Sequence, residues 1–193
     1  MGNSPELTWE NLEKAVNNCR GCVLGNQRLN AVLGRGSRNA LLMFVGEGPG
    51  RQEDEQGLPF VGAAGQLLDL ALDSLSFDKN DYYIANVVKC RPPMNRTPQP
   101  EEAASCLNFL RAQFALVRPK IIICLGSVAH TNLVSSTESI TRARGKWTQK
   151  KGIWFMSTFH PAALLRDEQK KIPFWQDLKM AKQKLDEIKN GQI

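Results

Sequence analysis

The sequence has no apolar run that approaches the length of a membrane-spanning helix. Its first residues, which include Glu6, Glu10 and Glu13, lack the basic and then apolar order of a secretory signal. The sequence also shows no internal repeat, low-complexity tract or linker. These absences predict a cytoplasmic protein in which residues 1–193 form a single domain, and we expect that domain to be a monomer.

Two residue types that often serve in active sites are scarce. Histidine occurs only as His130 and His160, and cysteine occurs five times. Five cysteines in a cytoplasmic protein argue against a disulfide framework and favour metal or thiol chemistry. The formal net charge of +6 suits a polyanionic partner such as nucleic acid, although charge alone does not identify one.

Four of the five cysteines form two pairs. Cys19 and Cys22 make a C-x-x-C sequence, and Cys90 and Cys106 make a second, widely spaced pair. Cys124 lies inside an apolar run and is more consistent with a small buried hydrophobic residue. Four thiolates can hold zinc tetrahedrally or bind an iron–sulfur cluster. The spacing leaves both alternatives open.

Segments with the pattern of strands and helices alternate along the chain. Short apolar runs predict buried strands, and the segments between them, with apolar residues at helical spacing, predict helices. We therefore expect an α/β protein with three α/β/α layers and a central, mainly parallel four-stranded sheet. The predicted strands are 41–45, 82–88, 120–125 and 153–159, and the predicted helices include 7–18, 65–76, 100–117 and 174–189.

The first predicted strand ends in a glycine-rich turn, GEGPG, at residues 46–50. Glycines there let the backbone approach a ligand closely. The carboxylates of Glu47 and Glu53 stand beside this turn, and a Pro-Phe element presents the aromatic ring of Phe60. Ligands of open α/β sheets bind beyond the carboxyl ends of the strands. The glycines alone fit an ordinary strand-to-helix turn, but the carboxylates and the Pro-Phe element favour an active site.

Two further loops are expected at the same edge of the sheet. Asn86 precedes the loop CRPPMNR (90–96), and His160 begins the segment HPAALLR (160–166). Alone, the asparagine fits a turn and the histidine fits a hydrogen-bonded structural role. Together with the glycine-rich turn, they supply an amide, an imidazole, carboxylates and an aromatic ring to one predicted pocket.

These sequences carry a family resemblance. The matching motifs are GEGPG (46–50), QGLPFVGAAGQLL (56–68), NVVKCRPPMNRTP (86–98) and HPAALLR (160–166), together with the four paired cysteines. With them the chain resembles the family-4 uracil-DNA glycosylases, the iron–sulfur branch of the uracil-DNA glycosylase superfamily. The resemblance implies a DNA repair hydrolase that flips uracil out of single- or double-stranded DNA and hydrolyses its N-glycosidic bond. It leaves free uracil and an abasic site.

The resemblance also decides between zinc and a cluster. It implies a [4Fe–4S] cluster that joins the N-terminal helix and its cysteine pair to the rest of the domain. The implied ligands are Cys19, Cys22, Cys90 and Cys106.

The same resemblance implies how uracil is bound. Phe60 would stack on the flipped base, and the Asn86 amide would meet both O4 and N3–H of uracil. His160 would stabilise the negative charge that develops on uracil O2 as the base leaves. The predicted substrate-binding residues are Gly48, Phe60, Asn86, Asn95 and His160.

The identity of the group that activates water stays open. In the best-known branch of the superfamily an aspartate does this at the position that matches Gly48 here. The work must therefore fall to another carboxylate. Glu47 and Glu53 are the two candidates, and the sequence does not rank them.

The segment after His160 fits a DNA-contacting element. Enzymes that flip a nucleotide insert an apolar residue into the vacated space, and Leu164 or Leu165 could do so. The alternative is that these leucines are core residues at the start of a helix, and we expect this of one of the two. Phosphate contacts are expected from Arg166, Arg91 and Arg96.

Two other functions are compatible with parts of the sequence. One superfamily branch traps uracil covalently without turnover, but it carries a basic insertion with a histidine that the loop at 92–96 lacks. A metal-stapled nucleotide-binding domain would use GEGPG as a phosphate loop. The lysine that a P-loop requires does not follow these glycines.

Overall fold

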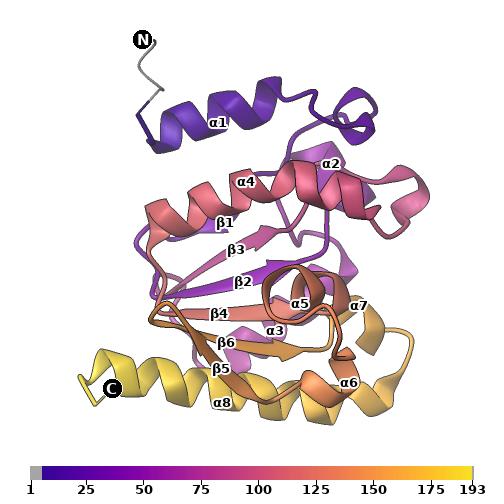
Figure 1. Cartoon of the computed structure of the whole chain (residues 1–193). Coiled ribbons are helices and arrows are strands. Elements are labelled where there is room, and N and C mark those ends of the chain that lie inside the picture. The colour runs from indigo at the N-terminus through magenta and orange to yellow at the C-terminus, as the bar shows by residue number, and fades with distance from the viewer. Residues whose placement is uncertain (1–5, 193) are drawn as a thin grey trace.

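The computed structural model describes residues 6–192 and alternates between strands and helices (Figure 1). The strands are β1 (Arg35–Gly36), β2 (Leu42–Gly46), β3 (Tyr82–Asn86), β4 (Ile121–Leu125), β5 (Trp147–Lys150) and β6 (Ile153–Thr158). The α-helices are α1 (Trp9–Asn18), α2 (Arg51–Gln56), α3 (Ala63–Ser74), α4 (Pro100–Val117), α5 (Ser127–Leu133), α6 (Ile140–Ala143), α7 (Pro161–Leu164) and α8 (Lys171–Lys189). Within this part of the chain no helix is both long and apolar enough to cross a membrane.

The sheet has six strands in the order β1-β3-β2-β4-β6-β5. The four inner strands are parallel, as expected, whereas β1 and β5 pair antiparallel at the two edges. The sequence did not predict these edge strands. β1 is two residues long, and three of the four residues of β5 are exposed, so neither carries the apolar pattern that identifies a buried strand.

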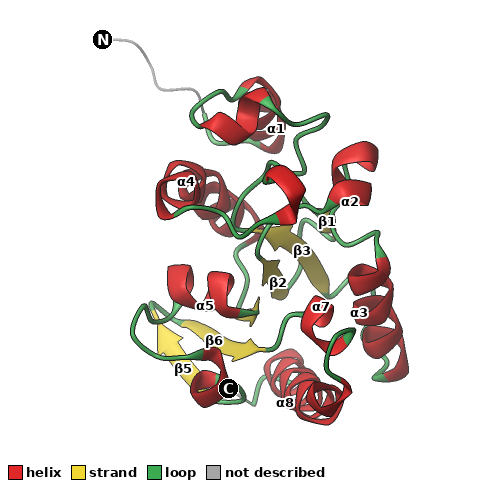
Figure 2. Ribbon diagram, turned by 90° about the vertical axis from the view of Figure 1, so that its right-hand side faces the viewer, coloured by secondary structure: helices red, strands yellow, loops and turns green. Residues whose placement is uncertain are grey.

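The sheet is covered by helices on both faces (Figures 1 and 2). Along β2, Leu42 and Phe44 pack in the core beneath α3 and α8, and Met43 and Val45 pack in the core beneath α4 and α5. This alternation explains why every residue of β2 is buried. Helix α1 lies outside α4 (Figure 2). The predicted α/β/α layers are therefore confirmed.

Local signals set the bounds of some helices and not of others. Helix α4 has Pro100 in its first turn, and Glu102 accepts the backbone N–H of Gln99 at 2.7 Å, so it begins where predicted. Helix α3 begins two residues earlier than predicted, and α8 begins at Lys171 rather than 174. Helix α2, in the acidic stretch after GEGPG, was not predicted.

The topology brings four loops to one edge of the sheet. Strands β3, β2, β4 and β6 run parallel, so their carboxyl ends lie together. Asn86 is the last residue of β3, and Glu47, Gly126 and His160 lie in the segments that follow β2, β4 and β6.

Candidate active site

A cavity of about 720 Å³ lies at the carboxyl ends of the four parallel strands. Residues that follow each of these strands line it, together with the start of α3. The side chains that matter most below are Glu47, Phe60, Asn86, His160 and Arg166. The structure thus brings together the residues that the sequence placed at one sheet edge.

Glycines let the aromatic and amide side chains approach the backbone closely. A Cβ atom on Gly46 would stand 2.6 Å from both the Phe60 ring and Oδ1 of Asn86. A Cβ atom on Gly65 would stand 1.9 Å from the carbonyl oxygen of Phe60, whose φ is 55°. Any side chain at these two positions would displace the ring, so the glycines fix where Phe60 lies. Its ring stacks on His160, with centroids 5.6 Å apart and planes 28° apart.

Asn86 carries an unpaired polar atom at this cavity. The residue is 2 % exposed, and its Oδ1 atom has no hydrogen-bond partner among the described residues. A buried acceptor left without a partner costs roughly 1–3 kcal/mol. A ligand that donates an N–H to Oδ1 would recover this cost, so the site is built to bind such a group.

His160 is held in one tautomer by the helix that it starts. Its Nδ1 atom accepts the backbone N–H of Ala162 at 3.1 Å at the N-terminus of α7, which leaves the proton of the neutral ring on Nε2. Burial lowers the pKa of His160 to about 4, and the nearby Arg166 acts in the same direction. The ring is therefore neutral at pH 7 and offers one N–H donor.

The two candidate glutamates have different surroundings. Oε1 of Glu53 accepts the backbone N–H groups of Val61 and Gly62 at 2.9 and 2.8 Å. Its Oε2 accepts the N–H of Gly50 at 3.1 Å. Three backbone donors therefore occupy both oxygens, and Glu53 ties the start of α2 to the segment that follows Phe60.

Glu47 lines the cavity, and among residues 6–192 no backbone N–H group donates to its carboxylate. Burial raises its pKa, an effect that the Thr97 hydroxyl and the charge of Arg166 partly oppose. A carboxylate with a raised pKa is a better proton acceptor than an ordinary one. Of the two glutamates, Glu47 is thus the one available to a ligand or a water molecule.

The two neighbouring leucines of the HPAALLR motif differ in burial. Leu164 is 2 % exposed and packs in the core with α3 and α8, whereas Leu165 is 53 % exposed. Leu164 therefore cannot reach DNA without leaving the core. Only Leu165 retains the expected surface role, next to the exposed Arg166 at the cavity.

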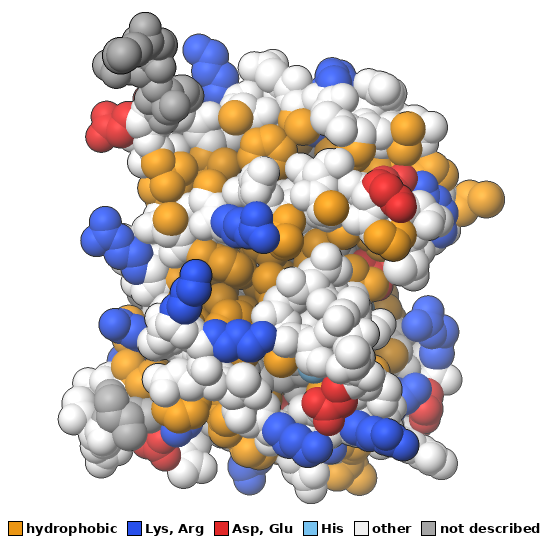
Figure 3. All heavy atoms as spheres, viewed as in Figure 1, with side chains coloured by type: hydrophobic (Ala, Val, Ile, Leu, Met, Phe, Trp, Pro, Cys, Tyr) orange, Lys and Arg blue, Asp and Glu red, His pale blue; other side chains and the backbone are white. Residues whose placement is uncertain are grey.

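The two arginines expected to contact phosphate in the loop after β3 make contacts within the protein. Arg96 donates to both carboxylate oxygens of Glu102, at 2.8 and 2.6 Å, and so is engaged within the protein. Arg91 donates to Oδ1 of Asn95 at 2.8 Å. Asn95 is exposed and lines the cavity, but this bond uses its oxygen. On the face in Figure 3, basic side chains are spread out rather than gathered in one patch.

Gly48 also has a steric role. A Cβ atom there would stand 2.7 Å from a methyl group of Val88, so a side chain would push the turn away from the segment after β3. Met94, which the sequence did not single out, forms the tip of this loop and is 93 % exposed.

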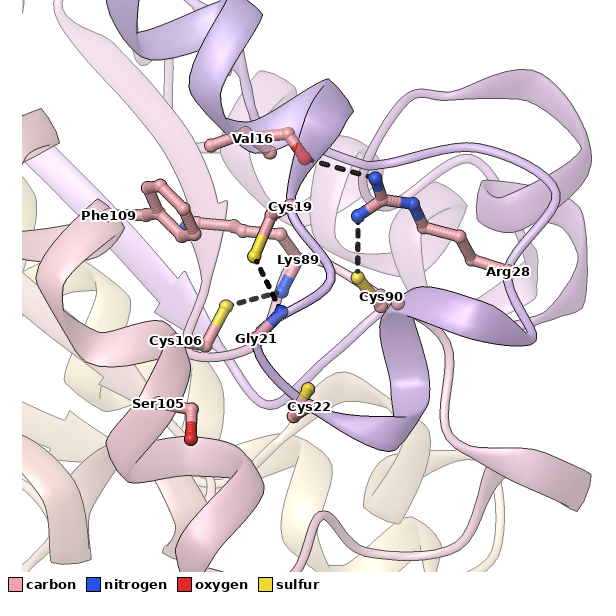
Figure 4. Close-up of a pocket in the computed structure, with 11 residues that line it drawn as sticks. Val16, Cys19, Gly21, Cys22, Arg28, Lys89, Cys90, Ser105, Cys106 and Phe109 are labelled. Atoms are coloured by element: carbon pink, nitrogen blue, oxygen red, sulfur yellow. Dashed lines mark hydrogen bonds between the residues drawn. The ribbon is translucent and has the colours of Figure 1, made fainter.

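The four paired cysteines line a second, smaller cavity of about 20 Å³ (Figure 4). Cys19 and Cys22 follow α1, Cys90 follows β3, and Cys106 lies in α4. Cys124 is buried within β4 and is not among the residues that line this cavity.

Three of these four sulfur atoms accept N–H groups (Figure 4). The donors are the backbone of Gly21 to Cys19 at 3.4 Å, the backbone of Lys89 to Cys106 at 3.2 Å, and the Arg28 guanidinium to Cys90 at 3.0 Å. Arg28 and Lys89 were not singled out from the sequence. The place of Lys89 between the apolar strand and Cys90 is a sequence signal for that residue, whereas no local pattern identifies Arg28.

The thiolates of four cysteines that share one cavity can hold zinc or an iron–sulfur cluster. Within residues 6–192, no three His, Cys, Asp or Glu side chains are already placed to hold a metal ion.

Comparison with known proteins identifies the family of the chain. The family model described as the Uracil DNA glycosylase superfamily matches residues 33–179. A Type-4 uracil-DNA glycosylase of Thermotoga maritima is 43% identical over 171 residues, which are 86% of this chain and 88% of that protein. Proteins of the same name from Pyrobaculum aerophilum and Archaeoglobus fulgidus are 42% and 39% identical, over 90% and 88% of this chain and 93% and 89% of their own lengths.

Proposed function

Because the chain belongs to the uracil-DNA glycosylase superfamily, we propose that it is a DNA repair enzyme that hydrolyses the N-glycosidic bond of uracil in DNA. Its products are free uracil and an abasic site. The observation that carries this proposal is the unpaired, buried Oδ1 of Asn86, in a cavity that it shares with His160 and Glu47.

Asn86 selects the base. Its Oδ1 accepts N3–H of uracil and its Nδ2 donates to O4, which pairs the atom that is unsatisfied in the free protein. Cytosine presents an amine and an unprotonated nitrogen at the same places. It would leave both ends of the amide unpaired, which rejects it strongly. The Phe60 ring, fixed by its glycine neighbours, supplies the face on which the flipped base stacks.

His160 stabilises the leaving group. As the glycosidic bond breaks, negative charge collects on uracil O2, and the Nε2–H of a neutral imidazole donates to it. The N–H of Ala162 fixes the tautomer before substrate binds, so no proton needs to move for the donor to be ready. The stacking contact with Phe60 keeps the ring in place until the base enters.

Glu47 positions and activates the water that attacks C1′. Its carboxylate lies in the same cavity, and burial raises its pKa toward the range in which it accepts a proton readily. Glu53 holds the segment around Phe60 through three backbone N–H groups. The separation of these roles supports Glu47 over Glu53 as the catalytic residue.

DNA is held at the rim of the cavity. Leu165 is the exposed apolar side chain that fills the space of the extruded nucleotide, and Arg166 contacts a phosphate beside it. Arg91 adds a further phosphate contact once its bond to Asn95 opens.

The four cysteines of the second cavity hold a [4Fe–4S] cluster. The ligands are Cys19, Cys22, Cys90 and Cys106. Bound there, the cluster ties the segment after α1 to the segment after β3 and to α4, which is a structural role.

The test is release of uracil from a defined duplex. Purified protein is incubated with DNA that contains one deoxyuridine, and the products are identified by mass spectrometry. Cleaved abasic DNA with free uracil is expected. A covalent adduct would identify a non-turnover binder instead, and unchanged DNA would contradict the glycosylase assignment.

The Asn86→Asp variant tests the base-selection step in the same assay. Uracil release should fall sharply, whereas affinity for the duplex, which phosphate contacts dominate, should change little. An Asn86→Ala variant with full activity and selectivity would remove this residue from the pocket.

Metal analysis tests the cofactor separately. Protein purified without oxygen should be brown and contain iron and sulfide at about four each, the stoichiometry of a Cys₄ cluster. Cys124→Ser is the matched control and should leave both unchanged, because Cys124 is not among the residues of that cavity. Stoichiometric zinc would contradict the assignment.

A further inference from the structure

Arg28 bridges two parts of the chain across the cysteine cavity (Figure 4). One end of its guanidinium donates to Sγ of Cys90 at 3.0 Å. The other end donates to the carbonyl of Val16 at 3.1 Å and to that of Asn17, both in the last turns of α1. No carboxylate pairs with Arg28 in the described part of the chain, so the sulfur is the group that faces its charge.

Lys89 is the second cation at this cavity, and it is 1 % exposed. Its ammonium donates to the carbonyl oxygen of Asn86 at 2.6 Å and to Oε1 of Gln113 at 2.5 Å. Both acceptors are neutral, and no ion pair of Lys89 occurs within the described residues. A buried charge without a counter-charge is costly, so a negative group beside Lys89 would stabilise its charged form.

The proposed cluster is that negative group. A [4Fe–4S] core with four thiolate ligands keeps roughly two net negative charges, and net charge together with hydrogen bonds to sulfur sets its reduction potential. Arg28 and Lys89 offer two positive charges at the same cavity, one through its guanidinium and one through a buried ammonium. Two positive charges equal in number the roughly two negative charges of the cluster. The Arg28 guanidinium contacts a cysteine sulfur directly, whereas Lys89 contacts one through its backbone N–H.

We propose that Arg28 and Lys89 are the charge partners of the cluster, which stabilise it against loss and raise its reduction potential. This inference rests on the proposed cofactor. Because the Arg28 guanidinium donates to both Cys90 Sγ and the carbonyl of Val16, it also connects the end of α1 to the segment that follows β3. Lys89 directly precedes Cys90 in the sequence, and its ammonium donates to the carbonyl oxygen of Asn86. It therefore connects the cysteine cavity with the candidate active site.

The experiment compares variants of the whole protein purified without oxygen. Arg28→Ala removes the charge and the bond to sulfur, and Arg28→Lys keeps the charge but loses the planar fork. Arg20→Ala is the matched control, because Arg20 stands next to Cys19, is exposed, and donates only to a carbonyl oxygen. Lys89→Met tests the buried cation with a side chain of similar length.

Two quantities are measured for each protein: the midpoint potential of the cluster and the rate at which its colour bleaches in air. Arg28→Ala should shift the potential to more negative values, because loss of a positive charge disfavours the added electron. It should also bleach about tenfold faster, the size of effect expected for one charge-assisted hydrogen bond. Arg28→Lys should recover part of the potential, and Arg20→Ala should match the wild-type protein.

An Arg28→Ala protein with the potential and bleaching rate of Arg20→Ala would overturn the inference, even if Lys89→Met failed to fold. Failure of the proposed function looks different. A wild-type protein without iron and sulfide removes the cofactor assignment, and one that releases no uracil removes the enzyme assignment. A brown, active wild-type protein with an unaltered Arg28→Ala variant defeats only this inference.

Discussion

The candidate active-site cavity, called the pocket below, and the cysteine cavity differ in how their polar groups are hydrogen-bonded. The pocket is large, about 720 Å³, and leaves the Oδ1 of Asn86 unpaired. The cysteine cavity is small, about 20 Å³, and pairs three of its four sulfurs with N–H donors. An acceptor without a hydrogen-bond partner suits a ligand that binds reversibly. Sulfur atoms that already accept hydrogen bonds suit a permanently bound cofactor.

The segment between the two sites explains how they can be close and yet distinct. Residues 86–90 continue from β3, and the N–H groups of Val87 and Val88 donate to the carbonyls of Gly46 and Glu47 at 2.9 and 3.1 Å. The segment is thereby fixed to the glycine-rich turn. Variants in the pocket should therefore change chemistry without changing iron content, and variants at the cysteines should do the reverse.

The largest effect within the pocket is expected from Glu47→Gln. Loss of a positioned general base costs roughly two to four orders of magnitude in rate, and we expect single-turnover uracil release to fall by that amount with unchanged iron content. Because the folded protein raises the pKa of Glu47, the wild-type rate should fall as pH drops through that raised value, where the carboxyl group is protonated. The variant should lack this acidic limb.

Glu53→Gln is the matched control for this experiment. It disturbs the bonds to Gly50, Val61 and Gly62, so it should lower thermal stability while it keeps the acidic limb. An acidic limb that persists in Glu47→Gln but disappears in Glu53→Gln would reverse the two assignments.

A somewhat smaller loss is expected from His160→Ala, about two to three orders of magnitude, as for one donor to a developing oxyanion. Iron content and duplex affinity should not change. Because the pKa of His160 is about 4, the wild-type rate should not decline between neutral and mildly alkaline pH. A decline that follows loss of an imidazolium proton would show that a charged ring is required.

His160 also predicts a pH dependence of stability. Its pKa falls from 6.5 to about 4 on folding, so the unfolded chain takes up the proton first as pH decreases. The contribution to stability is complete above pH 6.5 and is lost between pH 6.5 and about 4. The melting temperature of His160→Ala should therefore fall less steeply over this window than that of the wild type.

The smallest effect is expected at the rim of the pocket. Leu165→Ala should slow uracil release from duplex DNA by about tenfold, and less from single strands, because it removes the side chain that fills the vacated stack. Its stability should stay within about 0.5 kcal/mol of the wild type. Leu164→Ala should instead lower the free energy of unfolding by roughly 2–5 kcal/mol, because it opens a hole in the core.

The Leu164 and Leu165 variants together test which of the two side chains contacts DNA. Kinetic loss in Leu164→Ala without loss of stability would place the wrong side chain at the DNA. Rates on duplex and single-stranded substrates, measured beside urea unfolding curves, separate the two outcomes.

Features that depend on neighbours along the chain could be predicted from the amino-acid sequence. Apolar runs marked the four parallel strands, proline and acids marked the start of α4, and the glycine turn marked the end of β2. The rule that parallel strands end at one edge of a sheet predicts that Glu47, Asn86 and His160 share one pocket, and the structure confirms that they line the same cavity.

Features whose partners are distant in sequence could not be predicted and become visible in the folded chain. The carboxylate of Glu53 is hydrogen-bonded because the backbone N–H groups of Val61 and Gly62 lie next to it in the fold. Leu164 is buried because α3 and α8 cover it. Arg28 meets the sulfur of Cys90, 62 residues away. Periodicity and turn chemistry report the local backbone, whereas the burial and pairing of a side chain depend on which surfaces pack together, and that is settled only when the chain is folded.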